Sequence, residues 1–377
     1  MLLGRLAGQM VSLVLVLLVL QRYGSPALAG VTTFLAIMPG LLVSPIAGTL
    51  LDRFGRRRLI LIDYSVACCA LCLLAGLSIA DLLPVPLFLA IVFAQSLTFP
   101  LSSVGMRTLF PLVVPRPLWE RANAMDSNGY AVSTIFGPAI AGAVVAALHG
   151  EGGLLVAAAV FAVAVVVTLG VPDPEPEGRD HGHVLRAAWD GVVHVALHPT
   201  LRGLAVAVSI GNLANGIVFI TIPVVVLQRL GGTTTLVGQL FALSGVVAFV
   251  SVLLVGRIQT EGRERSLMIA AASLGAVAVA LLLARIEVAT LVVAMLLRGM
   301  GEGLYDVPMF TLRQRRTDPA WLGRAFAVSM SANFVGYPIG SAIGGTLAAA
   351  GPETALAGGL ASMVVSIVSL YALIPRA

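Results

Sequence analysis

Long apolar runs separated by short polar segments form the main pattern of this chain. A run of about 20 apolar residues is long enough to cross a bilayer as a helix. Inside hydrocarbon the backbone must satisfy its own hydrogen bonds, so such runs predict helices. We predict twelve membrane-spanning helices, at residues 3–21, 27–51, 59–80, 85–113, 122–148, 152–171, 201–228, 234–256, 267–285, 288–312, 324–349 and 354–374.

This alternation is interrupted once, near the middle of the chain. Residues 172–183 are acidic and rich in proline, a composition that favours a linker without packed structure. Residues 184–198 are apolar except for a polar stripe at spacing four, made of Arg186, Asp190, His194 and His198. The stripe predicts a helix that lies along the inner membrane surface or against the bundle, with a solvated polar face, and a pH-sensing or metal-binding stripe is the alternative. We therefore divide the chain into an N-terminal six-helix bundle (1–171), a cytoplasmic linker (172–200) and a C-terminal six-helix bundle (201–377).

The composition supports membrane integration and excludes other classes of protein. The chain is 58% hydrophobic and 11% charged, with a mean hydropathy of +1.00, whereas a soluble domain is about 25% charged. No nucleophile–base arrangement, phosphate-binding loop or metal-ligand spacing occurs within the predicted spans. Cys68, Cys69 and Cys72 share one apolar run without a nearby histidine, which predicts buried thiols and no metal site. We expect no enzyme activity, cofactor or metal.

The basic residues predict how the chain is oriented. All 23 are arginine; with the N-terminus inside, 18 fall on the cytoplasmic side, three outside and two within spans. Basic residues concentrate in the cytoplasmic loops of membrane proteins. The chain is therefore expected in the cell membrane with both termini in the cytoplasm. Because the arginines lie in short loops between spans, the net charge of +5 does not indicate nucleic-acid binding.

The loop between the second and third spans carries the most specific motif, Gly48-Thr-Leu-Leu-Asp52-Arg53-Phe-Gly55-Arg56-Arg57-Arg58. Gly48 would let a neighbouring helix approach, Asp52 can meet an arginine or a helix N-terminus, and Gly55 can take a positive φ. An ordinary basic loop explains the arginines but not this combination. The motif resembles G-x-L-x-D-R-x-G-R-R of the major facilitator superfamily. That resemblance implies a cytoplasmic gate formed by Gly48, Asp52, Arg53, Gly55, Arg56 and Arg57.

The two halves of the chain repeat each other. A shift of 203 residues aligns Met106-Arg-Thr-Leu109 with Met309-Phe-Thr-Leu312, and it also aligns residues 137–142 with 340–345. One constant offset across separate segments indicates duplication. The expected fold is therefore an all-α integral membrane protein, with twelve transmembrane helices in two pseudo-symmetric six-helix bundles and a binding cavity between them. This is the architecture that the facilitator resemblance implies.

The fifth span contains the segment Gly137-Pro138-Ala-Ile-Ala-Gly142. Proline removes a backbone hydrogen bond and bends a helix, while the glycines allow close packing. The segment resembles the Gly-Pro-x-x-x-Gly motif of facilitator antiporters, with Ser133 in place of the usual first glycine. A generic kinked packing helix explains it equally well. Together with residues 121–124, 311–316 and 323–324, the match resembles the macrolide-efflux and siderophore-exporter branch.

Charged groups inside apolar spans are candidate functional residues, because each costs at least about 2.5–3.5 kcal/mol to insert at the centre of a membrane helix. Arg298, Glu302 and Asp306 in the tenth span are spaced by four and share one helix face. They are expected to line a proton or substrate site, with Glu302 as the first choice for the proton; a self-neutralising structural pair is the alternative. Further candidates are Asp63, Asp126 and Arg107, where the acids are expected to pair with arginines, and Asn212 and Asn215, which fit a cavity or a helix interface.

The expected function is secondary active transport, in which inward proton movement drives export of a small amphipathic molecule of the drug, macrolide or siderophore class by alternating access. The expected partners are this substrate, protons and bilayer lipid, and the chain is expected to be a monomer. A proton-coupled or passive importer is the first alternative. A non-transporting sensor with the same fold is the second, which the intact loop motif disfavours.

Overall fold

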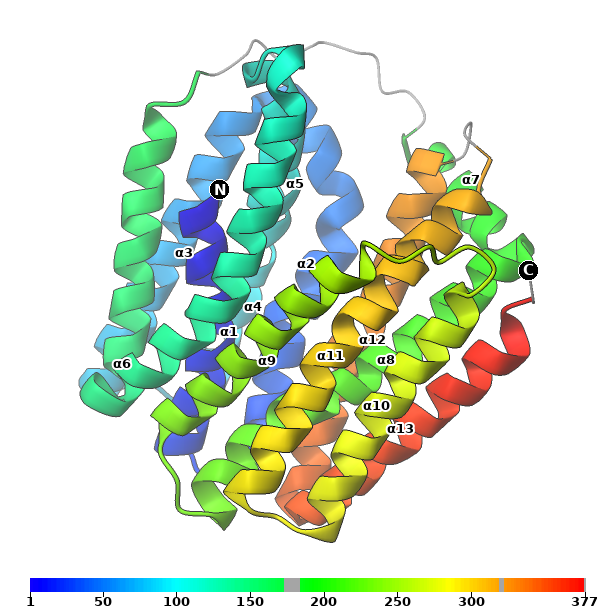
Figure 1. The fold of residues 1–377 in the computed structure, drawn as a ribbon. Helices are drawn as coiled ribbons and strands as arrows, with labels where there is room; N and C mark the ends of the chain where they lie inside the picture. Colours follow the sequence, from blue (N-terminus) through cyan, green and yellow to red (C-terminus); the bar gives the residue numbers. More distant parts are fainter. Residues whose placement is uncertain (173–183, 319–321, 376–377) are drawn as a thin grey trace. The chain divides into compact units, whose positions relative to one another are not determined.

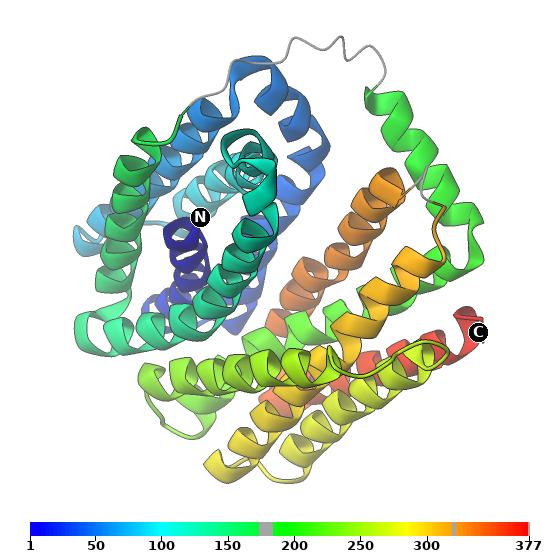
Figure 2. The ribbon, with the colours of Figure 1, turned by 45° about the horizontal axis from the view of Figure 1, so that its top comes forward.

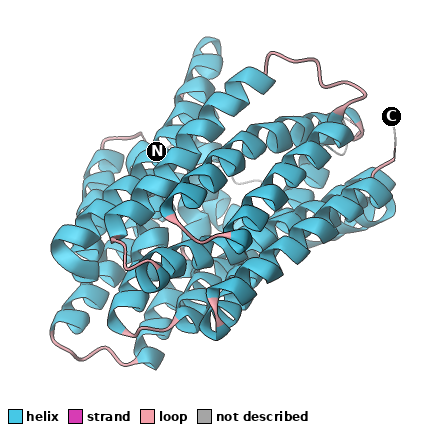
Figure 3. Cartoon of the chain, turned by 60° about the horizontal axis from the view of Figure 1, so that its bottom comes forward, coloured by secondary structure: helices cyan, strands magenta, loops and turns pink. Residues whose placement is uncertain are grey.

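A computed structural model describes residues 1–172, 184–318 and 322–375, and these ranges contain helices and no strand (Figures 1 and 3). The helices are α1 (Leu2–Arg22), α2 (Pro26–Phe54), α3 (Arg56–Ile79), α4 (Val85–Ser96), α5 (Phe99–Val113), α6 (Trp119–Leu169), α7 (Val184–Leu197), α8 (Pro199–Val224), α9 (Thr234–Val255), α10 (Glu264–Ala284), α11 (Val288–Arg315), α12 (Leu322–Ala350) and α13 (Pro352–Leu373). A 3-10 turn (Arg116–Leu118) precedes α6, and a π-helical turn (Val225–Arg229) follows α8.

Ten helical stretches among the described residues are long and apolar enough to cross a membrane. They account for eleven predicted spans, because the 45-residue stretch Met125–Leu169 covers both the fifth and the sixth. Figure 1 shows α6 as two arms joined by a turn, and His149 at that turn has a non-helical φ of 59°. The remaining predicted span, 324–349, is occupied by α12. The hydrophobic pattern therefore located all twelve spans.

The fourth predicted span, 85–113, is broken in the middle, which the prediction did not anticipate. α4 ends at Ser96 and α5 begins at Phe99. The hydroxyls of Ser96 and Thr98 donate to the carbonyls of Phe93 (2.8 Å) and Gln95 (3.0 Å). Pro100 has no N–H to donate. Such local bonds compete with the helical ladder, and a hydrophobic pattern alone does not reveal them.

The chain forms two compact units. Unit 1 consists of Met1–Gly24, Thr32–Gly182 and Thr233–Gln239, and unit 2 of Ser25–Val31, His183–Gly232 and Leu240–Ala377. The main division falls within the segment expected to be a linker. The first turns of α2 and α9 are each grouped with the unit that does not contain the rest of their helix.

In unit 1, α1 is the enclosed central helix. Residues 13–20 of α1 are all buried, and Figure 2 shows α1 (dark blue) among the other helices of this unit. α6 runs along α1 through small residues: a Cβ added at Gly153 would meet Val14 at 3.0 Å, and one at Gly137 would meet Gln9 at 2.6 Å. Lipid offers no hydrophobic reason for helices to associate, so close packing at small residues holds such pairs together.

In unit 2, α12 packs tightly along α8. Gly336, Gly340 and Gly344 repeat at spacing four on α12, and their nearest neighbours on α8 are Ser209, Leu213 and Ile217, which repeat at the same spacing. A Cβ on Gly344 would lie 2.6 Å from the Cα of Ile217. A row of glycines therefore lets the two backbones approach along several turns.

The internal repeat is visible in equivalent arginine contacts. Arg57 Nη1 donates to the carbonyl of Val171 at 2.8 Å, and Arg265 Nη1 donates to the carbonyl of Ile374 at 3.0 Å. The two acceptors lie 203 residues apart, as in the sequence repeat, and the two arginines lie 208 residues apart. Each half thus ties the start of its third helix to the end of its last one, with five fewer residues between donor and acceptor in the second half.

Close glycine contacts follow the same two offsets. Gly30 of α2 lies against Gly345 of α12, and Gly238 of α9 lies against Gly142 of α6; a Cβ on the first glycine of each pair would lie 2.9 and 3.0 Å from the Cα of the second. Gly345 follows Gly142 by 203 residues, and Gly238 follows Gly30 by 208. The two glycine contacts are therefore made by equivalent positions of the repeat: the second helix of each half contacts the fifth helix of the other half.

Candidate functional site

The strongest candidate site lies on α11, which begins at a capping box. The Glu287 side chain accepts a bond from the helix backbone, and the Glu287 N–H donates to the Thr290 hydroxyl (3.1 Å). Two further turns bring the helix to Arg298. Its Nη2 atom lies 3.7 Å from Glu302 Oε1, with side-chain exposures of 19% and 43%. This separation allows attraction but is too long for a hydrogen bond.

The charges on this face of α11 are not fully neutralised. Arg298 Nη1 is buried without a hydrogen-bond partner. Asp306 is exposed and makes no ion pair or hydrogen bond with another described residue. Arg298 and Glu302 do form an ion pair, as the alternative of a structural pair requires, but without a hydrogen bond between them. Incompletely paired charges within a membrane span are costly and mark a site where a ligand or ion can bind.

The glycines of the same segment face away from the charges. Gly299 and Gly303 pack against Ser244 and Ser251 of α9, and Ser251 donates to the Met300 carbonyl at 2.7 Å. Gly301 faces the carbonyl of Ala271 on α10. α11 is therefore held on two sides through small residues, which leaves the third side to the charged stripe.

A small pocket in unit 2 adjoins the Arg298 guanidinium. Its lining is almost wholly apolar and includes Val218 of α8, Ala278 and Leu282 of α10, and Met363 of α13. A guanidinium beside an apolar wall is chemically suited to an amphipathic molecule.

Asp63 on α3 differs from what the sequence predicts. It is 3% exposed, and no described arginine pairs with it. The hydroxyl-bearing residues Thr98, within the break in the fourth span, and Ser102, in the first turn of α5, lie beside its carboxylate. Among the described residues, no loop arginine neutralises Asp63 as the sequence predicts. The hydroxyl residues were missed because the sequence pattern did not reveal the break that places them there.

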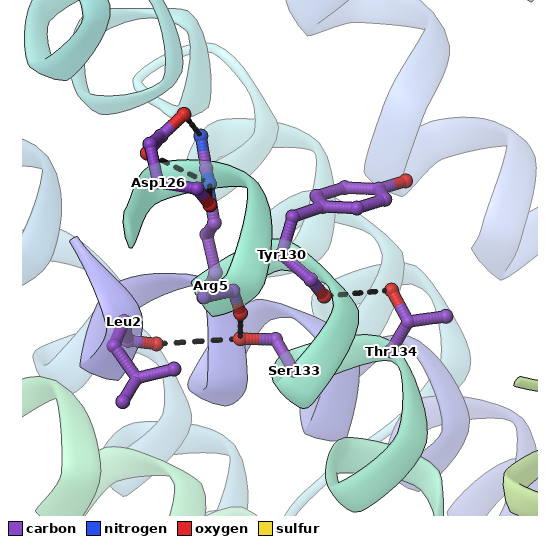
Figure 4. A network of polar contacts seen from close by, with 7 residues as sticks. Leu2, Arg5, Asp126, Tyr130, Ser133 and Thr134 are labelled. Carbon is purple, nitrogen blue, oxygen red and sulfur yellow. Dashed lines mark hydrogen bonds and ion pairs between the residues drawn. The ribbon is translucent and has the colours of Figure 1, made fainter. Parts of the chain in front are cut away.

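Asp126 does pair with an arginine, although with an unforeseen one. Arg5 of α1 places Nη1 2.9 Å from Asp126 Oδ1 and donates from Nη2 to Oδ2 at 3.0 Å (Figure 4). Arg5 also donates to the Asp126 carbonyl (2.7 Å) and lies over the Tyr130 ring. Arg107 is exposed and makes no ion pair with a described residue. Asp126 is therefore part of the join between α1 and α6.

The two asparagine candidates on α8 have different surroundings. Asn212 donates to the carbonyl of Asn333 on α12 at 2.9 Å, so here it joins two helices. Asn215 is half-buried on the same helix, with no hydrogen bond to a described residue. Asn215 therefore remains a cavity candidate.

The loop motif is only partly within the described residues. Gly55 adopts a φ of 91° between α2 and α3, as the tight reversal requires. Arg57 is bonded to the end of α6, and Arg53 is exposed. The side chain of Asp52 lies outside the described residues. No described atom lies within 4 Å of a Cβ on Gly48.

The antiporter-like segment is a packing segment on both sides. Gly137 lies against Gln9 and Met10 of α1, and Gly142 lies against Gly238 of α9. The Thr234 hydroxyl on α9 donates to the Gly142 carbonyl at 3.0 Å. Pro138 lies inside the helix between these contacts. Close packing is present, as both interpretations of the segment require.

Two other expectations need correction. Cys69 and Cys72 are exposed, because they lie on an outer face of α3 where a membrane protein meets lipid and not its own core. His194 and His198 are half-buried, with ring centroids 6.1 Å apart, since α7 packs against α12 instead of presenting this stripe to solvent. Burial lowers the pKa of His198, and His194 and Arg316 lower it further. The side chains of Arg186 and Asp190 lie outside the described residues.

Arg313 is a further residue whose place the sequence did not indicate. It is fully buried near the end of α11, with Nη1 2.8 Å from Met330 Sδ and the guanidinium over the Phe310 ring. A basic residue at the end of a span is normally predicted to lie at the cytoplasmic membrane surface. No local sequence signal distinguishes Arg313 from the exposed arginines beside it.

Relatives of known family share most of the chain. Residues 1–341 match the sequence profile described as the Major Facilitator Superfamily. The MFS-type transporter y4rN of Sinorhizobium fredii, described as uncharacterized, is 41% identical over 349 residues, which cover 92% of this chain and 86% of that protein. The enterobactin exporter EntS of Escherichia coli is 25% identical over 358 residues (93% and 82%). The multidrug efflux pump Tap of Mycobacterium tuberculosis is 28% identical over 193 residues (46% and 45%).

Solved structures share the fold. The nucleoside transporter NupG superposes with a TM-score of 0.78 at 13% identity, covering 98% of this chain and 97% of that one. A bacterial homologue of the iron transporter ferroportin gives 0.72 at 16% identity, covering 98% and 95%. Likeness at such low identity concerns the fold alone. The helical architecture, the loop and span motifs and the long sequence matches agree: this chain is a membrane transporter that belongs to the Major Facilitator Superfamily.

Proposed function

We propose that this transporter exports a small amphipathic molecule of the drug, macrolide or siderophore class and couples export to inward proton movement. The relatives described as an enterobactin exporter and a multidrug efflux pump support this direction. The proposed setting is the cell membrane, with a monomeric chain and both termini in the cytoplasm.

The observation that carries the proposal is the charged stripe on α11. Glu302 lies near the middle of a span, 3.7 Å from a guanidinium that does not hold it in a hydrogen bond. A carboxyl in this position can exchange a proton when its surroundings change, and Arg298 can take an anionic group of the substrate. Asp306, one turn further along, extends the stripe and provides a second proton acceptor.

The loop at 48–58 is proposed as the cytoplasmic gate. Gly55 makes the tight reversal and Arg57 anchors it to the end of α6. Asp52, Arg53 and Arg56 supply charges that can form and break pairs as the transporter alternates.

The test is a substrate panel in everted membrane vesicles, with a pH-sensitive dye that follows protons released when substrate is added. Glu302→Gln is expected to abolish proton-driven accumulation while substrate binding and downhill exchange continue. Glu353→Gln is the matched control, because Glu353 is an exposed acid at the start of α13, 3.8 Å from Arg229.

Three results would contradict the proposal. Full proton-coupled transport by Glu302→Gln would remove the role of this residue. Transport without any dye response would remove proton coupling. Accumulation driven in the opposite direction would make the protein an importer.

A further inference from the structure

We propose that Asp63 is a second ion-binding group, a carboxyl that holds a proton in an enclosed site against the break in the fourth span. This site lies in unit 1, apart from the charged stripe on α11. Asp63 follows the start of α3 by two turns and is 3% exposed. Thr98, within the break, and Ser102, in the first turn of α5, lie beside its carboxylate.

The two hydroxyls present acceptors to the carboxylate. Thr98 donates its hydrogen to the Gln95 carbonyl (3.0 Å), and Ser102 donates to the Phe99 carbonyl (3.3 Å). Their lone pairs are therefore the groups left for Asp63, whose Oδ1 atom is buried without a hydrogen-bond partner. While both hydroxyls bond main-chain carbonyls, Asp63 Oδ1 has no donor among the described residues.

One proton resolves this arrangement. A protonated carboxyl donates to a neighbouring hydroxyl oxygen, and that hydroxyl passes its own hydrogen to a main-chain carbonyl, so a continuous chain of hydrogen bonds forms. The same proton removes the negative charge, which is costly to bury without a partner. The break in the fourth span makes the chain possible because it places both hydroxyls beside α3.

The charged and titratable groups around the site do not replace the proton. Tyr64, the next residue of α3, directs its hydroxyl toward α1. Arg5 of α1 is held by Asp126 of α6. α2 approaches the end of α4 with Gly40, and α6 contributes the Phe161 ring, which lies 5.7 Å from the Tyr64 ring. Neither of these two contacts brings a charge.

The second half shows that the fold itself does not need this acid. The residues 208 positions after Asp63 and 203 positions after Thr98 are Ala271 and Gly301. Gly301 faces the Ala271 carbonyl: a Cβ added to Gly301 would lie 3.2 Å from that oxygen. The second half therefore keeps the equivalent helix contact without a polar side chain at position 271 or 301. An acid retained where the architecture accepts alanine serves a purpose other than packing.

The consequence for transport rests on the proposed function. A proton on Asp63 is occluded in this conformation, because the carboxyl is enclosed. It can enter or leave only when α3 and the broken span separate. A conformational cycle that opens this site to one membrane face at a time would carry one proton with each cycle.

The proton can be measured without transport. Infrared spectra of the purified wild-type protein in lipid nanodiscs at neutral pH are expected to contain a protonated-carboxyl C=O band that is lost in Asp63→Asn. The double variant Thr98→Val with Ser102→Ala is expected to keep the band but shift it to higher frequency, because the acceptor is removed. Asp126→Asn is the matched control and should leave the band unchanged, since that acid is paired with Arg5.

Size-exclusion elution identifies variants that fold, and the hydroxyl double variant tests the site if Asp63→Asn does not. An unchanged band in folded Asp63→Asn, or an unshifted band in the double variant, would overturn the inference. Sodium is the competing occupant of the site. The inference would also be overturned if sodium chloride raised the Tm of the wild-type protein above its value in choline chloride, did not do so for Asp63→Asn, and no protonated-carboxyl band were present. Suppose the band is lost in Asp63→Asn, but the wild-type protein shows no proton-coupled transport in vesicles. That result would contradict the proposed function and leave the inference about Asp63 intact.

Discussion

The contact of α3 with the fourth span (α4 and α5) and the contact of α10 with α11 are equivalent in the two halves of this transporter. The acid lies on the first helix of the pair in one half and on the second helix in the other. In the first half, the acid belongs to α3 (Asp63), and the broken fourth span supplies hydroxyls. In the second half, α10 offers Ala271 opposite Gly301, and the charges belong to α11 (Arg298, Glu302 and Asp306). The repeat positions of Thr98 and Pro100 are Gly301 and Gly303. The fourth span is interrupted where α11 continues unbroken.

This difference teaches that the two halves kept a backbone arrangement and diverged in chemistry. One crossing encloses a lone acid between helices, which suits occlusion. The other presents a loosely paired acid and base on an open face, which suits exchange with a ligand. The expected results below either break this contrast or make it sharper.

The largest effect is expected from Gly303→Leu. A Cβ at this position would lie 2.5 Å from the backbone carbon of Ser251, so α9 and α11 could not keep their separation. Overpacking of this kind costs about 1–3 kcal/mol or more, and here the obstacle is backbone that cannot move alone. We expect loss of the folded protein in size-exclusion chromatography, whereas Met300→Leu, exposed on the same helix, should elute as wild type. Normal folding of both variants would mean that small residues are not what holds α11 against α9.

A smaller effect is expected when the acid is moved to the other half. Ala271→Asp puts a carboxyl into the crossing with α11, opposite Gly301, where no hydroxyl can accept its proton. Insertion scales set the cost of an acid within a span at roughly 2.5–3.5 kcal/mol, so the Tm in detergent should fall clearly. Ala271→Asn is the control, since it matches the size without the charge and should lower the Tm less. Equal values for the two variants would show that charge is not what separates the two crossings.

The smallest effect on stability is expected from neutralising the α11 pair. Arg298→Met with Glu302→Gln removes a 3.7 Å contact between partly exposed groups, and such pairs contribute about 0–1 kcal/mol. The Tm should therefore change little, while proton-driven transport is lost. If the single variant Glu302→Gln is strongly destabilised and the double variant recovers, the pair is structural and the contrast between the crossings disappears.

The sequence located the helices because span length and hydrophobicity are local properties. It did not reveal the break between Ser96 and Phe99, because hydroxyl-to-carbonyl bonds leave the apolar pattern intact. The partner of Asp126 was missed for another reason: Arg5 lies 121 residues away, and no spacing rule connects them. Arg313 was assigned to the cytoplasm because nothing in its neighbours distinguishes a buried arginine from an anchoring one. Local pattern therefore predicts elements, and long-range pairing requires the fold.

The bonds from Arg57 to Val171 and from Arg265 to Ile374 have a consequence for the evolutionary record of the chain. Each arginine donates to a main-chain carbonyl, which every residue type carries. The acceptor position is therefore free to drift, as it has between valine and isoleucine, while the donor is held. Among homologues, the contact would appear as a constant arginine beside an unconstrained aliphatic site, with no covarying partner. Methods that infer proximity from paired substitutions would not detect the bond that ties the two ends of each half together.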